Sequence, residues 1–126
     1  MVDLSHLAEK NMFLEGTGSI VFDHINKLAY ACKSDRTNID LLKLVCDHLG
    51  YKYIEFTAVD QSGLPIYHTN VMMWIGTNVA AICTDAIKIP EVSFYIILKT
   101  LVLGRIIFQK LTSPSCFTPR YTKILF

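Results

Sequence analysis

The stretch FLEGTGSIVFDHINKLAYAC, residues 13–32, decides how the chain begins to fold. Two β-prone runs, 19–22 and 28–32, flank the turn residues 23–27. Two such runs joined by a short polar turn predict an antiparallel hairpin. The glycines of GTG stand just before the first run, where the lack of a side chain lets another group approach the backbone closely. This stretch therefore predicts a β-hairpin with an open approach to its first strand.

The segments that follow the hairpin alternate between helix and strand. Residues 39–50 carry apolar side chains at helical spacing and end on a glycine suited to a helix C-cap. A strand over 53–59 and a turn at 60–63 complete a strand–strand–helix–strand unit. The pattern then begins again, after roughly fifty residues, with two further strands at 71–75 and 79–83. The sequence thus predicts an α/β (α+β) chain with a partial internal repeat.

The composition of the chain changes near Ile89. The 126 residues carry 12 basic and 11 acidic side chains, a net charge of +1, which argues against a basic stripe for nucleic acid. Residues 1–88 have 7 basic and 10 acidic side chains, whereas residues 89–126 have 5 basic ones and a single acidic one, Glu91. The hydrophobic fraction of 52% argues against disorder. We therefore predict a domain over 1–88 and an unrelated apolar, basic tail over 89–126.

The cysteines and the apolar segments indicate a cytoplasmic protein. The cysteines form no CxxC pair and no Cys/His cluster of zinc spacing, so free thiols and no metal are expected at Cys32, Cys46, Cys83 and Cys116. Residues 1–12 alternate charged and apolar side chains, which argues against a secretory signal. The most apolar run, 92–108, is shorter than the ~20 residues of a membrane span and contains Lys99 and Arg105. Membrane anchorage is therefore not favoured.

Two polar residues at strand entrances are candidates for chemistry. Glu15 stands beside the glycines of FLEGTGS, and His68 precedes the strand in YHTNVMMWIG. Because they occupy equivalent positions in successive repeats, they are able to converge on one cavity as an acid/base pair. The alternatives are a solvated glutamate in a turn and a structural histidine. Met72 and Met73 indicate core, and GTGS lacks the lysine of a phosphate loop.

Three motifs, FLEGTGSIVFD, NKLAYACKSDRTN and YIEFTAVDQSGLPIYHTNVMM, occur in order and resemble the amidinotransferase/arginine deiminase superfamily. The resemblance covers about residues 3–88 and is closest to the branch of citrulline-utilisation hydrolases or arginine deiminase-related proteins. It implies a pentein fold, a five-bladed α/β propeller of ββαβ repeats, of which this chain would hold about one and a half blades. It also implies hydrolysis of a guanidino or ureido group by a cysteine thiolate, with neither a metal nor an organic cofactor.

The same resemblance assigns roles to individual residues. Glu15 matches the carboxylate that binds the guanidinium through charge-assisted hydrogen bonds, and His68 matches the general acid/base. Asn70 stands where many members have a second carboxylate, which favours neutral citrulline over cationic arginine. Arg36, in the SDRTN loop, either contacts a substrate carboxylate or caps a turn, and we favour the turn.

Other features set the chain apart from this superfamily. Its members are more than twice as long, and their nucleophilic cysteine lies near the C-terminus in surroundings that none of the four cysteines matches. We therefore expect a fragment of a guanidino- or ureido-group hydrolase that is inactive alone, followed by a tail that a frameshift would explain. The alternative is a non-catalytic interaction module that self-associates through open sheet edges.

Overall fold

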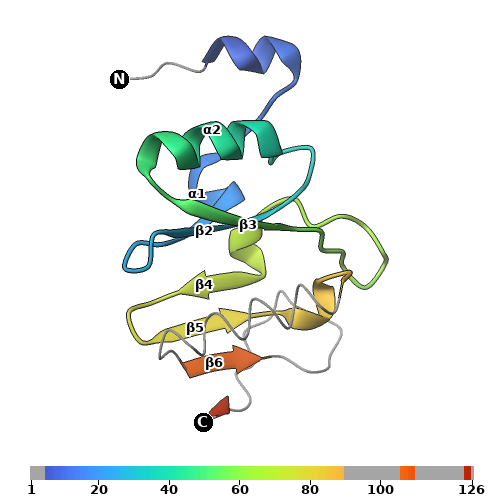
Figure 1. The fold of residues 1–126 in the computed structure, drawn as a ribbon. Coiled ribbons are helices and arrows are strands. Elements are labelled where there is room, and N and C mark those ends of the chain that lie inside the picture. The colour runs from blue at the N-terminus through green and yellow to red at the C-terminus, as the bar shows by residue number, and fades with distance from the viewer. Residues whose placement is uncertain (1–4, 90–105, 110–123, 126) are drawn as a thin grey trace.

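The computed structural model describes residues 5–89, 106–109 and 124–125, which form two β-sheets and several helices (Figure 1). The three-stranded sheet contains, in spatial order, β1 (Ile20–Asp23), β2 (Leu28–Cys32) and β3 (Lys52–Phe56). The four-stranded sheet contains, in spatial order, β4 (Met73–Ile75), β5 (Val79–Ile82), β6 (Ile106–Gln109) and β7 (Ile124–Leu125). The helices are η1 (Ser5–Lys10), α1 (Gly16–Ser19), α2 (Ile39–Leu49), η2 (Thr69–Val71) and η3 (Thr84–Ala86).

The two sheets share one pattern of strand pairing. β1 and β2 form the predicted antiparallel hairpin, with Ile20 opposite Ala31, and β2 pairs in parallel with β3. β4 and β5 are likewise antiparallel, with Met73 opposite Ile82, and β5 pairs in parallel with β6. The mixed α+β class is confirmed, and the pairing pattern occurs twice. The number of propeller blades stays a prediction.

α2 belongs to the first unit, which consists of β1, β2, α2 and β3. Both ends of this helix are capped. The side-chain oxygen of Asn38 accepts hydrogen bonds from the backbone N–H groups of Asp40 and Leu41. Gly50 follows the last turn with φ 72°, in the left-handed region that glycine adopts without strain. The helix predicted over 39–50 is therefore confirmed, with its glycine as the cap. α2 lies across one face of the three-stranded sheet (Figure 1).

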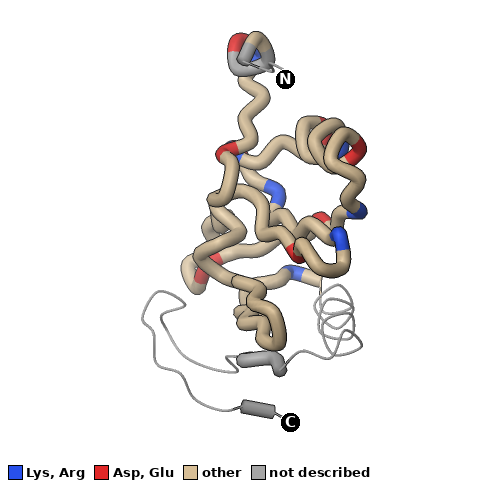
Figure 2. Tube along the Cα trace, turned by 90° about the vertical axis from the view of Figure 1, so that its left-hand side faces the viewer, with Lys and Arg blue, Asp and Glu red and all other residues tan. Residues whose placement is uncertain are grey.

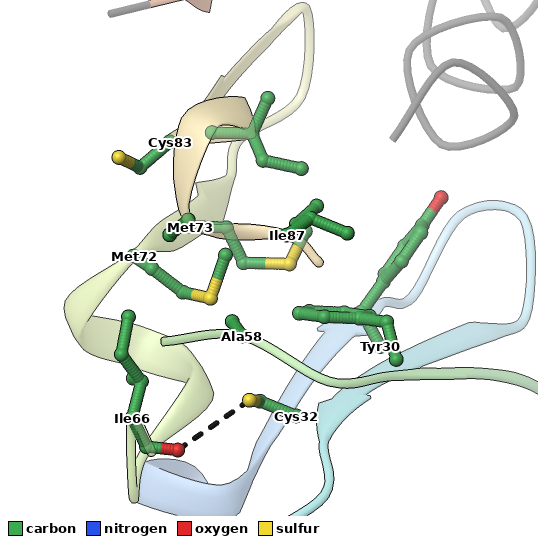
Figure 3. Close-up of a cluster of buried hydrophobic side chains, with 11 residues drawn as sticks. Tyr30, Cys32, Ala58, Ile66, Met72, Met73, Cys83 and Ile87 are labelled. Atoms are coloured by element: carbon green, nitrogen blue, oxygen red, sulfur yellow. Dashed lines mark hydrogen bonds between the residues drawn. The ribbon is translucent and has the colours of Figure 1, made fainter. Parts of the chain in front are cut away.

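β2 is buried on both faces because it lies between two hydrophobic cores. Ala29 and Ala31 point into the core beneath α2, and Tyr30 and Cys32 point to the opposite face, following the period of two in a strand. There they pack against the second unit, which begins with η2, β4 and β5, and Met73 of β4 belongs to the same core (Figure 3). Coverage of both faces explains why β2 is a continuous apolar run and not an alternating one.

Two predicted strands start later than expected because a helical turn precedes each of them. The first strand starts at Ile20 instead of Ser19, since the residues GTGS form α1. The fourth starts at Met73 instead of Val71, since residues 69–71 form η2. Glycine-rich and polar stretches before a strand carry no periodicity that distinguishes a turn of helix from extended backbone.

The segment after β3 leaves the sheet earlier than the sequence indicated. β3 ends at Phe56 instead of Val59, and Ala58 forms only an isolated bridge. The turn predicted from Asp60 is present, because the Asp60 carboxylate accepts hydrogen bonds from two of the backbone N–H groups that follow it.

Some predictions fall on residues that the structure does not describe. Cys116 lies outside the described residues, and so does the apolar run 92–108 apart from its end in β6. Within the described ranges, no helix combines the length and the apolar content needed to cross a membrane. Acidic and basic residues are dispersed along the described trace (Figure 2).

Candidate active site

Glu15 and His68 occupy equivalent places in the two units. Each is the N-cap residue of the helical turn that precedes the first strand: Glu15 before α1 and β1, and His68 before η2 and β4. They are 53 positions apart, and Ile20 and Met73, which begin β1 and β4, have the same separation. The repeat thus presents one equivalent position from each unit.

The structure brings the side chains of Glu15 and His68 together. Glu15 Oε2 lies 2.5 Å from His68 Nε2, and both side chains are 36% exposed. An ionised carboxylate only accepts hydrogen bonds, so Nε2 carries the proton and Nδ1 is the basic nitrogen of the neutral ring. No residue in the described part of the chain bonds to Nδ1. The pair therefore combines a carboxylate with a partly exposed imidazole, while its role in chemistry stays a prediction.

Arg36 is a second partner of the Glu15 carboxylate. Arg36 Nη1 donates a hydrogen bond to Glu15 Oε1 at 2.8 Å, and the Arg36 side chain is 58% exposed. The residue lies in a turn, where its backbone N–H donates to Ser34 Oγ. Its side chain, however, reaches Glu15, which neither alternative from the sequence anticipated. Both oxygens of Glu15 are therefore engaged.

These two partners hold the pKa of Glu15 below its ordinary value. The hydrogen bond from His68 is the largest cause, the hydrogen bond from Arg36 is the next, and partial loss of solvent opposes both. The carboxylate therefore stays ionised at neutral pH and offers a negative charge at the surface.

The Ser19 side chain links the backbone of Glu15 to that of Arg36 through hydrogen bonds. Its buried hydroxyl accepts a hydrogen bond from the Glu15 N–H at 2.9 Å and donates one to the Arg36 carbonyl at 2.7 Å. Beside it, the Asn38 N–H donates to the Phe13 carbonyl at 2.8 Å. The approach of Arg36 to Glu15 is thus built into the main chain.

Thr69, in the second unit, hydrogen-bonds to the backbone of the first unit. Its fully buried hydroxyl donates to the Ser19 carbonyl at 2.5 Å and accepts from the Cys32 N–H at 2.7 Å. Gly18 leaves room for the neighbouring imidazole, since a Cβ there would lie 3.3 Å from Cδ2 of His68. The sequence did not lead us to predict the positioning roles of Ser19 and Thr69. The available signal was their location, since Ser19 is the last residue of GTGS and Thr69 directly follows His68.

The remaining predicted residues lie apart from this contact or are buried. Asn70 is exposed in η2, two residues after His68. The cysteines within the described ranges are buried and form no disulfide with one another: Cys32, Cys46 and Cys83. Burial raises the pKa of the Cys32 and Cys46 thiols, which disfavours the reactive thiolate.

Cys32 illustrates this buried state. Its thiol donates to the Ile66 carbonyl, at a sulfur–oxygen distance of 3.4 Å, inside the core that also holds Met72 and Met73 (Figure 3). The prediction that these methionines belong to the core is confirmed. Among the residues that the structure describes, no cluster of three or more His, Cys, Asp or Glu side chains is arranged to hold a metal ion.

Residues 1–102 match the family described as N,N dimethylarginine dimethylhydrolase, eukaryotic, and the match includes Glu15, Arg36 and His68. The chain belongs to the dimethylarginine dimethylhydrolase family. This family lies within the amidinotransferase superfamily that the sequence motifs predicted, so that recognition is confirmed. The match extends past Ile89, where the resemblance of the motifs ended. No curated protein and no solved structure matches the chain.

Membership of the dimethylarginine dimethylhydrolase family places the Glu15–His68 pair in a chemical context. The description of the family names a methylated guanidino amino acid as the molecule acted on. A guanidinium is a planar cation with N–H donors, for which an exposed, ionised carboxylate is the natural acceptor.

Proposed function

We propose that this member of the dimethylarginine dimethylhydrolase family binds the guanidino group of N,N-dimethylarginine through Glu15 and holds His68 in the position of the general acid/base. The observation that carries the proposal is the 2.5 Å contact between Glu15 Oε2 and His68 Nε2, in a chain of this family. It joins a permanent negative charge to a proton-transferring group at one exposed point.

Glu15 suits the binding of a cation because its charge persists. Its lowered pKa keeps the carboxylate ionised throughout the neutral range. Guanidinium N–H groups then bind through charge-assisted hydrogen bonds, which are roughly twice as strong as neutral ones. The position of Glu15 at the N-cap of α1 holds the carboxylate at a defined place on the backbone.

His68 suits proton transfer because one of its nitrogens is occupied and the other is available. The Glu15 carboxylate holds Nε2–H, selects one tautomer and stabilises the imidazolium when Nδ1 gains a proton. Where a thiolate attacks the guanidinium carbon, Nδ1 would protonate the departing amine and would later accept a proton from the water that hydrolyses the covalent intermediate. The two roles use the same nitrogen in opposite directions.

Asn70 provides a test of substrate charge. We propose that its neutral amide, in place of a second carboxylate, weakens the preference for cationic over neutral substrates. Asn70→Asp is therefore expected to raise the binding of N,N-dimethylarginine relative to that of citrulline. Asn78→Asp, in the exposed turn between β4 and β5, is the matched control and should leave the ratio unchanged.

The proposal assigns binding and proton transfer, but not nucleophilic attack, to the described residues. The three described cysteines are buried, and the pKa values of the Cys32 and Cys46 thiols are raised. We therefore expect this chain to bind substrate without turnover. Release of dimethylamine from N,N-dimethylarginine above the level of His68→Ala would contradict this expectation.

The binding role of Glu15 is tested by titrating N,N-dimethylarginine into the wild type and Glu15→Gln, followed by calorimetry or NMR. Loss of a charged hydrogen-bond acceptor is expected to weaken binding by roughly tenfold or more. In the assay of dimethylamine release, the matched control for His68→Ala is His48→Ala, which removes an exposed histidine of α2. Equal affinity of the wild type and Glu15→Gln would reject the proposal.

A further inference from the structure

The Arg36 side chain is itself a guanidinium bound to the carboxylate that we assign to the guanidinium of the substrate. Arg36 Nη1 lies 2.8 Å from Glu15 Oε1, and His68 Nε2 occupies Oε2. A ligand that approaches Glu15 therefore meets two oxygens that already have partners. Of these, Oε1 is the one held by a group with the same chemistry as the ligand.

We infer that Arg36 occludes the site as an internal guanidinium, so that a guanidino or ureido ligand binds Glu15 by displacing Arg36 from Oε1. This inference rests on the proposed function, because it assumes that Glu15 receives the ligand. It adds a built-in competitor that sets how tightly the free protein binds its ligand.

The backbone around the pair keeps the competitor in place. Ser19 joins the Glu15 N–H to the Arg36 carbonyl through one buried hydroxyl. An isolated β-bridge pairs Leu14 with Thr37, so that the segments carrying both charged residues run side by side. Arg36 therefore returns to Glu15 whenever the ligand leaves.

The side chains, in contrast, allow exchange. The Arg36 side chain is 58% exposed and that of Glu15 is 36% exposed, so water solvates Arg36 as soon as it leaves Oε1. An exposed ion pair of this kind lowers the fraction of open carboxylate only modestly. Its usual strength corresponds to an apparent affinity reduced by roughly two- to sixfold.

The test compares the wild type with Arg36→Met, which keeps the aliphatic stem and removes the donors. The probes are N,N-dimethylguanidinium and the neutral N,N-dimethylurea, neither of which has a carboxylate for Arg36 to contact. Binding is followed by NMR through the ring signals of His68. Lys43→Met, which removes an exposed positive charge from α2, is the matched control.

Competition for Oε1 predicts that Arg36→Met binds both probes roughly two- to sixfold more tightly than the wild type, whereas Lys43→Met binds them as the wild type does. The gain for dimethylguanidinium should shrink as salt screens the Arg36–Glu15 pair. A gain confined to the cationic probe would indicate charge repulsion and overturn the inference, as would no gain at all. Failure of both probes to bind any variant would overturn the proposed function together with the inference.

Discussion

The turn before β1 and the turn before β4 are equivalent in the repeat, but they are held in different ways. In the first, the Ser19 hydroxyl bonds to the Glu15 N–H and the Arg36 carbonyl, both within the first unit. In the second, the Thr69 hydroxyl bonds to the Ser19 carbonyl and the Cys32 N–H, and both of these belong to the other unit. Glu15 is therefore positioned by its own unit, whereas His68 is positioned by its neighbour.

This difference teaches that the Glu15–His68 contact depends on the docking of the two units. Each turn places a polar residue at its N-cap, but of the two hydroxyls, those of Ser19 and Thr69, it is the one on Thr69 that bonds across the boundary between the units. Substitutions at the two hydroxyls should consequently differ in both size and reach.

Thr69→Val is expected to have the largest effect. The change keeps the shape of the side chain but leaves the Cys32 N–H and the Ser19 carbonyl without their partner in the core. Each buried unpaired group costs about 1–3 kcal/mol, so we expect a loss of about 3 kcal/mol in the free energy of unfolding by urea. Thr77→Val, at an exposed turn, is the matched control. Equal losses of stability in Thr69→Val and Thr77→Val would show that the Thr69 hydroxyl does not stabilise the docking of the two units.

Ser19→Ala is expected to have a smaller and more local effect. Its two hydrogen bonds lie in partly buried surroundings, where water is able to replace part of what is lost. We expect a loss of about 2 kcal/mol in urea unfolding. NMR should show Arg36 released from Glu15 while the His68 ring stays near Gly18. A loss of the Glu15–His68 contact equal to that in Thr69→Val would show that both turns depend on docking.

Asn38→Ala tests the independence of the first unit. Removal of the N-cap acceptor of α2 should cost about 1 kcal/mol of stability, the usual value for such a cap. The backbone bond from the Asn38 N–H to the Phe13 carbonyl remains, so Glu15 should keep its position. Asn78→Ala is the matched control, measured by the same urea titration. Displacement of Glu15 in NMR spectra of Asn38→Ala would contradict this expectation.

The titration of Glu15 tests which unit dominates its electrostatics. Its pKa is lowered first by His68 of the second unit and next by Arg36 of its own. NMR titration should therefore show a larger rise of the Glu15 pKa in His68→Ala than in Arg36→Met. His48→Ala should leave it in place. A larger rise in Arg36→Met than in His68→Ala would show that the pKa of Glu15 is set mainly by its own unit.

The same pKa shift has a consequence for stability. A carboxylate with a lowered folded-state pKa stabilises the fold above its unfolded pKa, and this contribution is lost as the pH falls through the folded pKa. The stability advantage of the wild type over Glu15→Gln should therefore disappear on acidification below about pH 4.5, its ordinary value. Urea titrations of both proteins at neutral and acid pH measure this. An advantage that persists at acid pH would contradict the assigned cause.

Much of the local structure was predictable because local patterns encode it. The hairpin over β1 and β2 follows from two β-prone runs and a polar turn, and α2 follows from its apolar spacing and Gly50. The strand starts were missed where helical turns precede them, because residues 16–19 and 69–71 carry no period. The equivalence of Glu15 and His68 was predictable from the repeat, since it is a matter of position along the chain.

The sequence by itself determined the periodic elements, their caps, the repeat and the family, because each depends on residues that are near in the chain or on ordered motifs. Only the tertiary structure decided that Arg36 occupies Glu15 and that the hydroxyl of Thr69 bonds to the first unit. These partners lie 21 to 50 positions apart. Their contact depends on how whole strands dock, which is set by the burial of two cores around β2 and not by any local pattern.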